Sequence, residues 1–183
     1  MEVPEEVKRA IGQFVRPLAA MRSGARWVRT EGLHVTLKFI GEAQADQCEK
    51  IKAALGAVTS SAPVQLTFRG TGFFPSARHP RVFWAGIDST PNLAEITAGI
   101  ESRLGPLGIA PEERAFKPHL TLARFKTEGG LADLRAAIDG AGAVDFGGCT
   151  AGEFHLFESK LRPGGAEYAK LATFNFTTAR GGG

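Results

Sequence analysis

The sequence of 183 residues is poor in cysteine, in long apolar runs and in net charge. Its two cysteines, Cys48 and Cys149, lie far apart, and neither belongs to a CxxC pair or a tight cluster with histidine. This pattern argues against a zinc finger or a disulfide scaffold. No apolar run reaches the length of about 18 residues that indicates a membrane span, and the acidic first residues lack the apolar core of a secretory signal. We therefore expect a cytoplasmic protein with no membrane partner.

The net charge of +3 permits an anionic ligand but is too small to indicate binding along an extended nucleic acid. Apolar residues make up 43% of the chain and charged residues 22%, which is typical of a folded globular protein. The sequence has no GxGxxG segment after a predicted strand and no GxxxxGK[ST] segment. It therefore lacks the markers of dinucleotide-binding and P-loop domains.

Apolar spacing and breaker residues outline the expected elements. The spacing predicts helices over residues 4–16, 45–58, 91–104 and 131–138, with Pro17 ending or kinking the first of them. Shorter apolar runs predict strands over residues 26–28, 33–40, 64–68, 82–87 and within 117–125, a loop over 70–80 and a hairpin over 152–176 that turns at 162–165. Because helices and strands alternate only loosely, we expect an α+β fold with largely antiparallel sheets.

The strongest feature is a motif, His-x-Thr-Leu, that begins at His34 and again at His119. Each copy lies in a predicted strand, and the order of helices and strands around the two copies matches in outline. We interpret this as an internal duplication, so that residues 1–183 form a single domain of two related lobes. A pseudo-two-fold axis between the lobes would bring the two copies face to face across a central groove.

The strand period places the histidine and the threonine of each copy on one face, about 7 Å apart along the strand. In the first copy, Val35, Leu37 and Phe39 point to the opposite face, where they can pack under a helix. Leu120 and Leu122 do the same in the second copy. Each copy therefore offers one imidazole and one hydroxyl to the groove.

Two facing imidazoles and two hydroxyls suit an in-line displacement at phosphorus. One histidine, neutral, acts as a base, while the other, protonated, acts as an acid on the opposite side. The hydroxyls of Thr36 and Thr121 donate hydrogen bonds to the phosphate oxygens, where charge is held in the transition state. A zinc site is the alternative use for His34 and His119, but no Asp or Glu stands at a convincing spacing to complete its ligands. We expect no metal and no other cofactor.

The segments that carry this pattern also resemble a known family. They read EGLHVTLKFIGE over residues 31–42, GTGFFP over 70–75, PRVFWAGI over 80–87 and FKPHLTLARF over 116–125. The sequence resembles the 2H phosphoesterase superfamily, and within it the RNA 2′,3′-cyclic phosphodiesterases, which are also known as 2′-5′ RNA ligase-like proteins. The resemblance implies a bilobal fold and metal-independent hydrolysis of RNA 2′,3′-cyclic phosphate ends to 2′-phosphomonoesters.

The resemblance also implies a role for each motif residue. It assigns His34 as the proton donor to the leaving 3′-oxygen, His119 as the proton acceptor that activates water, and Thr36 and Thr121 as phosphate-binding residues. The motif residues themselves are nearly symmetric and do not choose between the two histidine roles. The expected partner is an RNA end or a related cyclic nucleotide, bound by a monomer. A ligase that runs the reverse reaction and an RNA-binding module with little chemistry stay open as alternatives.

Four further residues are candidates for substrate binding. Arg124 corresponds to a family arginine, although strict alternation places it opposite His119, so a bulge is needed to turn it into the groove. Lys38 shares the nominal face of the first motif, with a solvated sheet-edge lysine as the alternative. One of Phe73 and Phe74 is expected to line the groove and stack on a base, and the sequence does not choose between them.

The two remaining histidines and residues 1–3 lie outside the two motifs. We expect His79 to be an exposed loop residue and His155 a half-buried strand residue, both outside the site. The family that the chain resembles opens with a short apolar strand, whereas here residues 1–3 lead directly into Pro4. If that strand is missing, one edge of a sheet is exposed.

Overall fold

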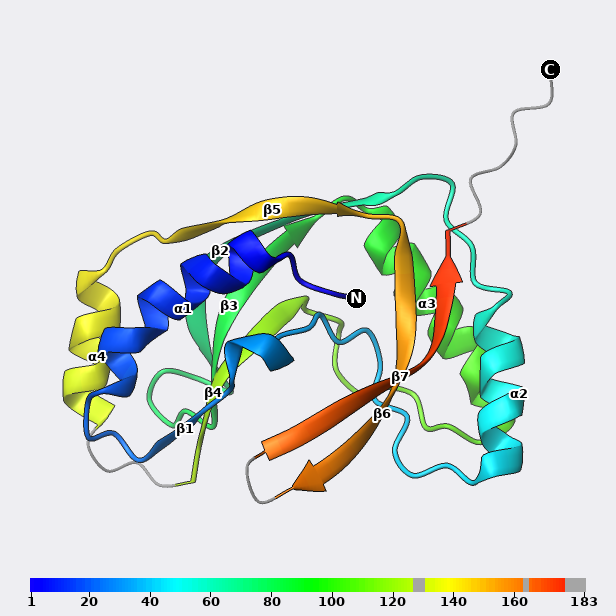
Figure 1. Ribbon diagram of the computed structural model, residues 1–183, viewed down its shortest axis with the longest axis horizontal. Helices are drawn as coiled ribbons and strands as arrows, with labels where there is room; N and C mark the ends of the chain where they lie inside the picture. The colour runs from blue at the N-terminus through cyan, green and yellow to red at the C-terminus, as the bar shows by residue number, and fades with distance from the viewer. Residues whose placement is uncertain (127–130, 163–164, 177–183) are drawn as a thin grey trace.

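Five antiparallel strands form the main sheet of the computed structural model, which describes residues 1–126, 131–162 and 165–176. A two-stranded hairpin forms a second sheet beside it (Figure 1). The order in the main sheet is β1 (Ala25–Trp27), β4 (His119–Phe125), β3 (Val82–Ser89), β2 (Val64–Phe74) and β5 (Asp145–Ala151), and the hairpin consists of β6 (Glu153–Arg162) and β7 (Gly165–Asn175). The predicted α+β class with antiparallel sheets is confirmed.

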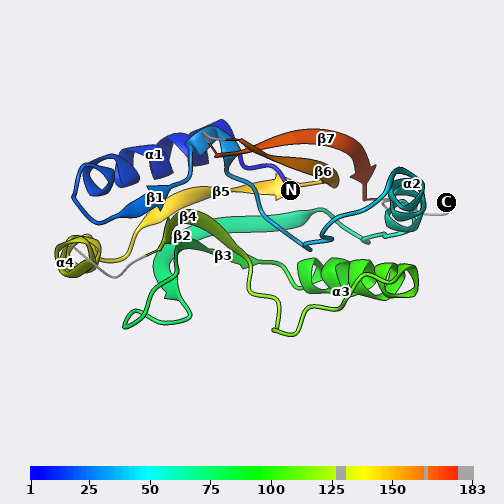
Figure 2. The same cartoon turned by 90° about the horizontal axis from the view of Figure 1, so that it is seen from below.

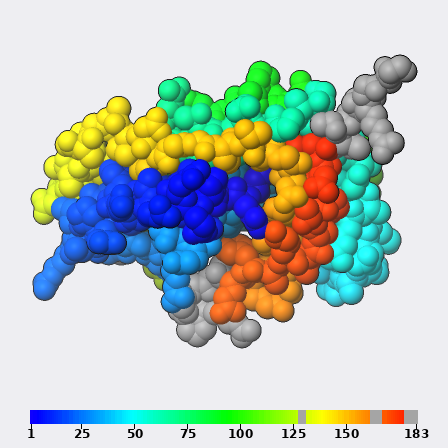
Figure 3. All heavy atoms as spheres, turned by 45° about the horizontal axis from the view of Figure 1, so that its top comes forward, coloured from blue at the N-terminus to red at the C-terminus, as the bar shows by residue number. Residues whose placement is uncertain are grey.

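The helices lie in two pairs at opposite ends of the main sheet (Figure 2). They are α1 (Glu5–Ala19), α2 (Ala45–Leu55), α3 (Asn92–Leu104) and α4 (Leu131–Gly140), with short 3-10 turns η1 (Thr30–Gly32) and η2 (Gly105–Leu107). Helix α1 contacts α4 at one end, and α2 contacts α3 at the other. The space-filling view shows α1 lying along β5 (Figure 3). In the described ranges, no helix has the length and hydropathy needed to cross a membrane.

The helix faces predicted from apolar spacing are the faces that form the core. On α1, Val7, Ile11 and Leu18 are buried, as the i, i+4 and i+11 spacing indicates. The largest fully buried side chains of the sheet are Phe68 and Phe83, on β2 and β3. Burial of these apolar side chains supplies the main stabilising free energy of the fold.

The structure differs from the sequence predictions at several element boundaries and adds one strand. Pro17 does not end α1, which continues to Ala19, because a proline in the last turn removes only one helix hydrogen bond. The loop expected over 70–80 begins later, since β2 runs on to Phe74 after a bulge at Gly70. Strand β5 was not predicted at all, because its sequence, DFGGCTA, lacks a clear apolar alternation. The hairpin is confirmed, although the two central residues of its predicted turn, 163 and 164, lie outside the described residues.

The first motif does not lie in a regular strand, contrary to the prediction for residues 33–40. Only one antiparallel bridge forms there, between Glu2 and His34. The backbone of Met1 and Val35 makes two hydrogen bonds around this bridge, with N–O distances of 2.8 and 2.9 Å. Residues 1–3 therefore occupy the edge that the sequence suggested was exposed, and the side chains of Met1 and Val3 are buried.

Phe39 is a correction to the predicted core. It was expected to pack under a helix with Val35 and Leu37, but its side chain is 69% exposed because the regular alternation of a strand is absent there. Val35 is buried and Leu37 is partly buried against the core, as predicted.

We predict opposite outcomes for two phenylalanine truncations. Phe83→Ala removes a ring that is fully buried, so it should lower the free energy of unfolding by about 3–5 kcal/mol in urea titrations. Phe39→Ala is the matched control and should change that free energy by less than about 0.5 kcal/mol, because its ring is exposed. Equal losses in both variants would contradict the assignment of the core.

Candidate active site

The second motif lies at the amino-terminal end of β4, which runs between β1 and β3 in the main sheet. The pairing of β4 with β3 places His119 opposite Gly86 and Thr121 opposite Trp84. Directly paired residues of an antiparallel sheet share a face, so these four residues lie on one face, which we call the open face. The opposite face packs into the core, where Leu120 and its neighbour Leu122 are buried.

A β-bulge at Leu122 changes the alternation further along β4. Phe83 pairs with Ala123 while Trp84 pairs with Thr121, so β4 has one extra residue at this point. Leu122 and Ala123 are therefore buried consecutively, and the next residue, Arg124, is exposed on the open face. We expected such a bulge from the sequence, because without it Arg124 would point away from the face of the second motif.

A second bulge decides which of the two candidate phenylalanines lies on the open face. The pairing between β2 and β3 shifts by one residue between Phe68 and Thr71, where Gly70 adopts a positive φ of 66°. After this shift Phe74 pairs with Val82 on the open face, whereas Phe73 pairs with the buried Phe83.

The ring contacts agree with this placement. The Phe73 ring lies 5.1 Å from that of Phe83, so Phe73 packs into the core and is not placed to bind substrate. The Phe74 ring and the His119 imidazole form an edge-to-face pair at a centroid distance of 5.0 Å. It also lies 5.2 Å from the indole of Trp84, which rests over Gly72 where a Cβ atom would overlap it. Phe74 and Trp84 together therefore form an aromatic surface beside the second motif.

The first motif reaches the site from a different element. The chain that leaves η1 passes beside the end of β4 that carries the second motif (Figures 1 and 2). A hydrogen bond from the Val28 amide to the Leu122 carbonyl, 2.8 Å long, ties the preceding segment to β4. His34 and Thr36 are both partly exposed, and within the described part of the chain no hydrogen bond engages the hydroxyl of Thr36 or Thr121.

Both motif histidines are held by the same backbone contact. Nδ1 of His34 lies 2.8 Å from the carbonyl oxygen of Gly32, and Nδ1 of His119 lies 2.8 Å from that of Lys117. Because a carbonyl oxygen only accepts hydrogen bonds, each Nδ1 must carry the proton and donate it. In the neutral form of each ring, Nε2 is then left as a free lone pair that can accept a proton.

Aromatic rings from the hairpin surround His34. The Tyr168 ring on β7 meets the imidazole edge-on at 4.5 Å, and the Phe157 ring on β6 lies 6.3 Å away. Together with His34 these rings line a hollow of about 160 Å³. Burial lowers the pKa of His34 below its ordinary value, while the hydrogen bond to Gly32 opposes that shift. Sequence analysis missed Tyr168 because no motif marks it and only the fold brings β7 to the first motif.

Lys38 does not point toward the motif residues. Its ammonium forms an ion pair with Glu101 of α3, at 2.8 Å, and donates a hydrogen bond of 2.6 Å to the carbonyl of Ala110. The Lys38 side chain is only 4% exposed. The alternative of a solvated lysine at a sheet edge is therefore wrong, since this lysine joins the first-motif segment to α3.

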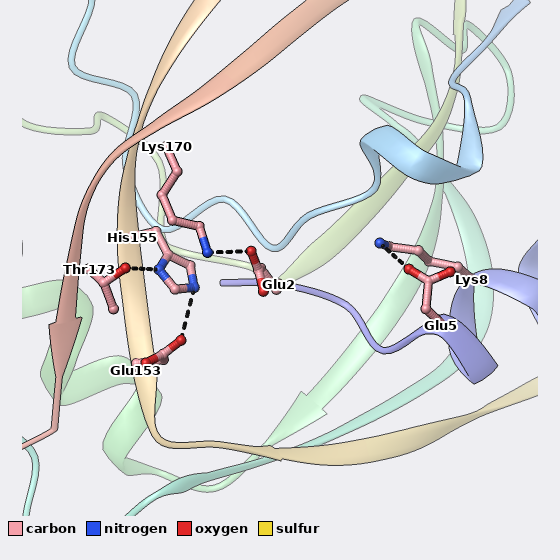
Figure 4. Close-up of polar contacts among 7 residues, drawn as sticks. All are labelled: Glu2, Glu5, Lys8, Glu153, His155, Lys170 and Thr173. Carbon is pink, nitrogen blue, oxygen red and sulfur yellow. Dashed lines mark hydrogen bonds and ion pairs between the residues drawn. The ribbon is translucent and has the colours of Figure 1, made fainter.

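His155 belongs to a separate polar cluster (Figure 4). Its Nδ1 lies 3.0 Å from the hydroxyl of Thr173, and its Nε2 lies 3.6 Å from Glu153. The neighbouring Glu2 pairs with Lys170 at 2.6 Å. An open hollow of about 700 Å³ adjoins this cluster, but none of the motif histidines or threonines lines it. The larger hollow is thus not the candidate active site.

His79 is exposed in its loop, as predicted.

Known proteins of similar sequence indicate the family of the chain. The family model described as LigT-like phosphoesterase matches residues 1–84 and 87–168. A Methanocaldococcus jannaschii protein named RNA 2′,3′-cyclic phosphodiesterase is 34% identical over 92% of this chain and 93% of its own length. A Thermus thermophilus protein of the same name is 32% identical over 98% of this chain and 89% of its own length.

Solved structures share the fold over nearly the whole chain. A crystal structure of a Thermus thermophilus protein superposes with a TM-score of 0.78 at 30% identity, covering 95% of this chain and 93% of that one. Escherichia coli LigT in complex with 3′-AMP gives a TM-score of 0.76 at 24% identity, covering 97% of this chain and 95% of that one, which shows a common fold. The chain belongs to the LigT-like phosphoesterase family, and the resemblance inferred from the two motifs is confirmed.

We predict that Lys38 contributes to stability and not to substrate binding. Lys38→Met removes the charged hydrogen bonds to Glu101 and Ala110, so the free energy of unfolding should fall by about 1.5–3 kcal/mol in urea titrations. Lys52→Met, which breaks a more exposed pair with Glu49, serves as the control and should cost less than about 1 kcal/mol. A Lys38→Met protein of wild-type stability with a substrate KM raised about tenfold would refute this assignment.

Proposed function

We propose that the protein hydrolyses RNA ends that carry a 2′,3′-cyclic phosphate to 2′-phosphomonoesters, with His34 and His119 as its acid and base. The observation that carries the proposal is the pair of matching Nδ1 hydrogen bonds, which leaves Nε2 of each motif histidine available for proton transfer. Two relatives named RNA 2′,3′-cyclic phosphodiesterase align with 92% and 95% of the chain, which supports the same substrate class.

The proposed reaction moves one proton at each histidine. Water attacks the phosphorus atom, and Nε2 of His119 accepts a proton from it as the new phosphorus–oxygen bond forms. The bond from phosphorus to the ribose 3′-oxygen breaks, and the protonated Nε2 of His34 donates its proton to that oxygen. The products are a 2′-phosphomonoester and a 3′-hydroxyl. The histidines finish with exchanged protonation states, and proton exchange with solvent restores them.

Three other side chains are proposed to hold the reacting phosphate. The hydroxyls of Thr36 and Thr121 donate hydrogen bonds to its non-bridging oxygens, where negative charge increases in the transition state. Arg124 lies on the same face as Thr121, and its guanidinium suits a phosphate through two parallel hydrogen bonds. The aromatic surface of Phe74 and Trp84 is proposed to contact the terminal base, because bases stack on aromatic faces.

The environment of His34 bears on its role as the acid. Burial lowers the pKa of His34, so this ring is more often neutral in the free protein than an exposed histidine at the same pH. A bound phosphodiester brings a negative charge close to the ring, and that charge raises the pKa again and favours the protonated donor. The assignment of His34 as donor and His119 as acceptor follows the family pattern. No contact of the described residues favours ligation or binding without turnover.

The first test uses an RNA oligomer that ends in a 2′,3′-cyclic phosphate, incubated with EDTA. The wild-type protein should form a 2′-phosphate end, read by mass and by sensitivity to phosphatase. His34→Ala and His119→Ala should each lower kcat/KM by at least about 10²-fold, since each removes a general acid or base. His79→Ala is the matched control, because this histidine is exposed in a loop outside the motifs, and it should retain activity.

Three results would contradict the proposal or its mechanism. One is a protein that binds the oligomer but never opens the cyclic phosphate, which would leave a binding module. Another is retention of more than about a tenth of the activity in either motif variant, because a general acid or base contributes far more than that. The third is activity that disappears on adding EDTA and returns with a divalent cation, which would contradict the metal-independent mechanism.

The burial of His34 gives a prediction for the pH profile of kcat/KM, which reports the pKa values of the free protein. Tyr168→Ala removes the ring at 4.5 Å and admits water, so the pKa of His34 should rise toward its ordinary value. The limb of the profile that titrates with His34 should therefore move to higher pH. Tyr168→Phe keeps the ring and should leave that limb in place; a limb that stays put or moves down in Tyr168→Ala would contradict the account.

A further inference from the structure

A pair of arginines extends the open face beyond the proposed site. Strand β1 lies at the edge of the main sheet and pairs with β4, with Arg26 directly opposite Arg124. Directly opposite residues share a face, so Arg26 lies on the open face, and both arginines are exposed. The neighbouring Trp27 points the other way and packs its ring 6.1 Å from that of Phe83.

The two arginines carry charge that no acidic side chain of the described residues neutralises. Like charges directly opposite in a sheet are destabilising, and no carboxylate of residues 1–126, 131–162 or 165–176 forms an ion pair with Arg26 or Arg124. Elsewhere on the open face the sheet does neutralise an arginine, since Arg69 of β2 forms an ion pair with Asp88 of β3. The unneutralised pair is therefore a local feature, and an anionic ligand would relieve its repulsion.

The position of the pair fits a nucleotide chain that leaves the reacting phosphate. Along β4 the open face presents His119, then Thr121, then Arg124, and the last two are separated by about 10 Å of strand. Across the sheet at the level of Arg124, Arg26 lies on one side, while Val82 and Phe74 lie on the other. One row of the face thus runs from two guanidiniums to an apolar and aromatic surface. This order matches the separation of phosphate and base in a nucleotide.

We propose that Arg26, together with Arg124, binds the phosphodiester next to the reacting cyclic phosphate, so that the protein prefers an oligonucleotide end to a cyclic mononucleotide. This inference rests on the proposed function, and it adds a contact outside the two motifs. A guanidinium is always charged and matches phosphate oxygens with two parallel hydrogen bonds, which a lysine cannot do. The short strand β1 holds Arg26 at a fixed register to Arg124, so the pair is arranged before RNA binds.

The test compares two substrates with the same reactive group. One is 2′,3′-cyclic AMP, and the other is a short RNA oligomer ending in a 2′,3′-cyclic phosphate. In Arg26→Gln the ratio of kcat/KM for the oligomer to that for the mononucleotide should fall about tenfold, mainly through KM, because only the oligomer has the upstream phosphodiester. Arg103→Gln removes the same charge from α3, at the far end of the molecule, and should leave the ratio unchanged.

Salt dependence and stability separate this role from a structural one. The slope of log kcat/KM for the oligomer against log salt concentration should become shallower by about 0.7 in Arg26→Gln, the value for one lost phosphate contact on a single strand. The melting temperature should equal or exceed that of the wild type, because the like-charge repulsion is gone. Arg26→Lys should recover part of the ratio, since the charge returns without the paired hydrogen bonds.

The outcomes distinguish failure of the upstream phosphate contact from failure of the proposed function. A wild-type protein that opens neither substrate refutes the proposed function, and the inference falls with it. If the wild type opens both, equal losses on the two substrates in Arg26→Gln, or an unchanged ratio and salt slope, overturn the upstream contact and leave the proposed function standing. A melting temperature well below that of the wild type would instead give Arg26 a structural role and overturn the inference.

Discussion

The composition of the open face depends on backbone register, because a β-bulge in each of two strands of the main sheet decides which side chains point to that face. The extra residue in β4 is Leu122, and it turns Arg124 to the face that carries His119 and Thr121. The extra residue in β2 follows Phe68, and it turns Phe74 to the same face. With strict alternation these side chains would point into the core, so the bulges determine which groups can meet one ligand.

The two motifs lie in unequal backbone. The second copy lies in an interior strand of the main sheet, whereas the first lies in a segment with a single bridge to Glu2. Each histidine nevertheless donates Nδ1–H to the carbonyl two residues before it, at 2.8 Å in both copies. This local contact needs no sheet, and it explains how two different environments present the same imidazole nitrogen.

The environments of the two imidazoles still differ. Tyr168 and Phe157 pack around His34, and burial lowers its pKa, while Phe74 is the ring that forms an edge-to-face pair with His119. The proposed acid and base share one motif, so their different roles need different surroundings, and the ring contacts of the described hairpin residues are with His34. The asymmetry therefore comes from residues outside the motifs.

The sequence predicted the features that depend on local periodicity. It predicted the α+β class, the helix faces of the core, most strands and the His-x-Thr pairs, because these follow from spacing within one segment. It did not choose between Phe73 and Phe74, since a bulge reverses the alternation and leaves little mark in a sequence. It also gave no sign of the ion pair of Lys38, because the partner Glu101 lies on α3 far along the chain.

The residues that were missed depend on long-range pairing. Tyr168 reaches the first motif only through the hairpin, and Arg26 faces Arg124 only through the register of β1 with β4. Neither residue has a neighbouring sequence signal, because the partners are brought together by the whole fold.

The central claim is that Nε2 of both motif histidines is free to exchange protons. The most direct measurement is ¹⁵N NMR of the imidazole nitrogens, assigned with single histidine variants, at a pH where both rings are neutral. The account predicts a protonated Nδ1 and an unprotonated Nε2 for His34 and for His119, because each Nδ1 donates to a carbonyl oxygen. A neutral ring of either histidine that carries its proton on Nε2 would contradict the account.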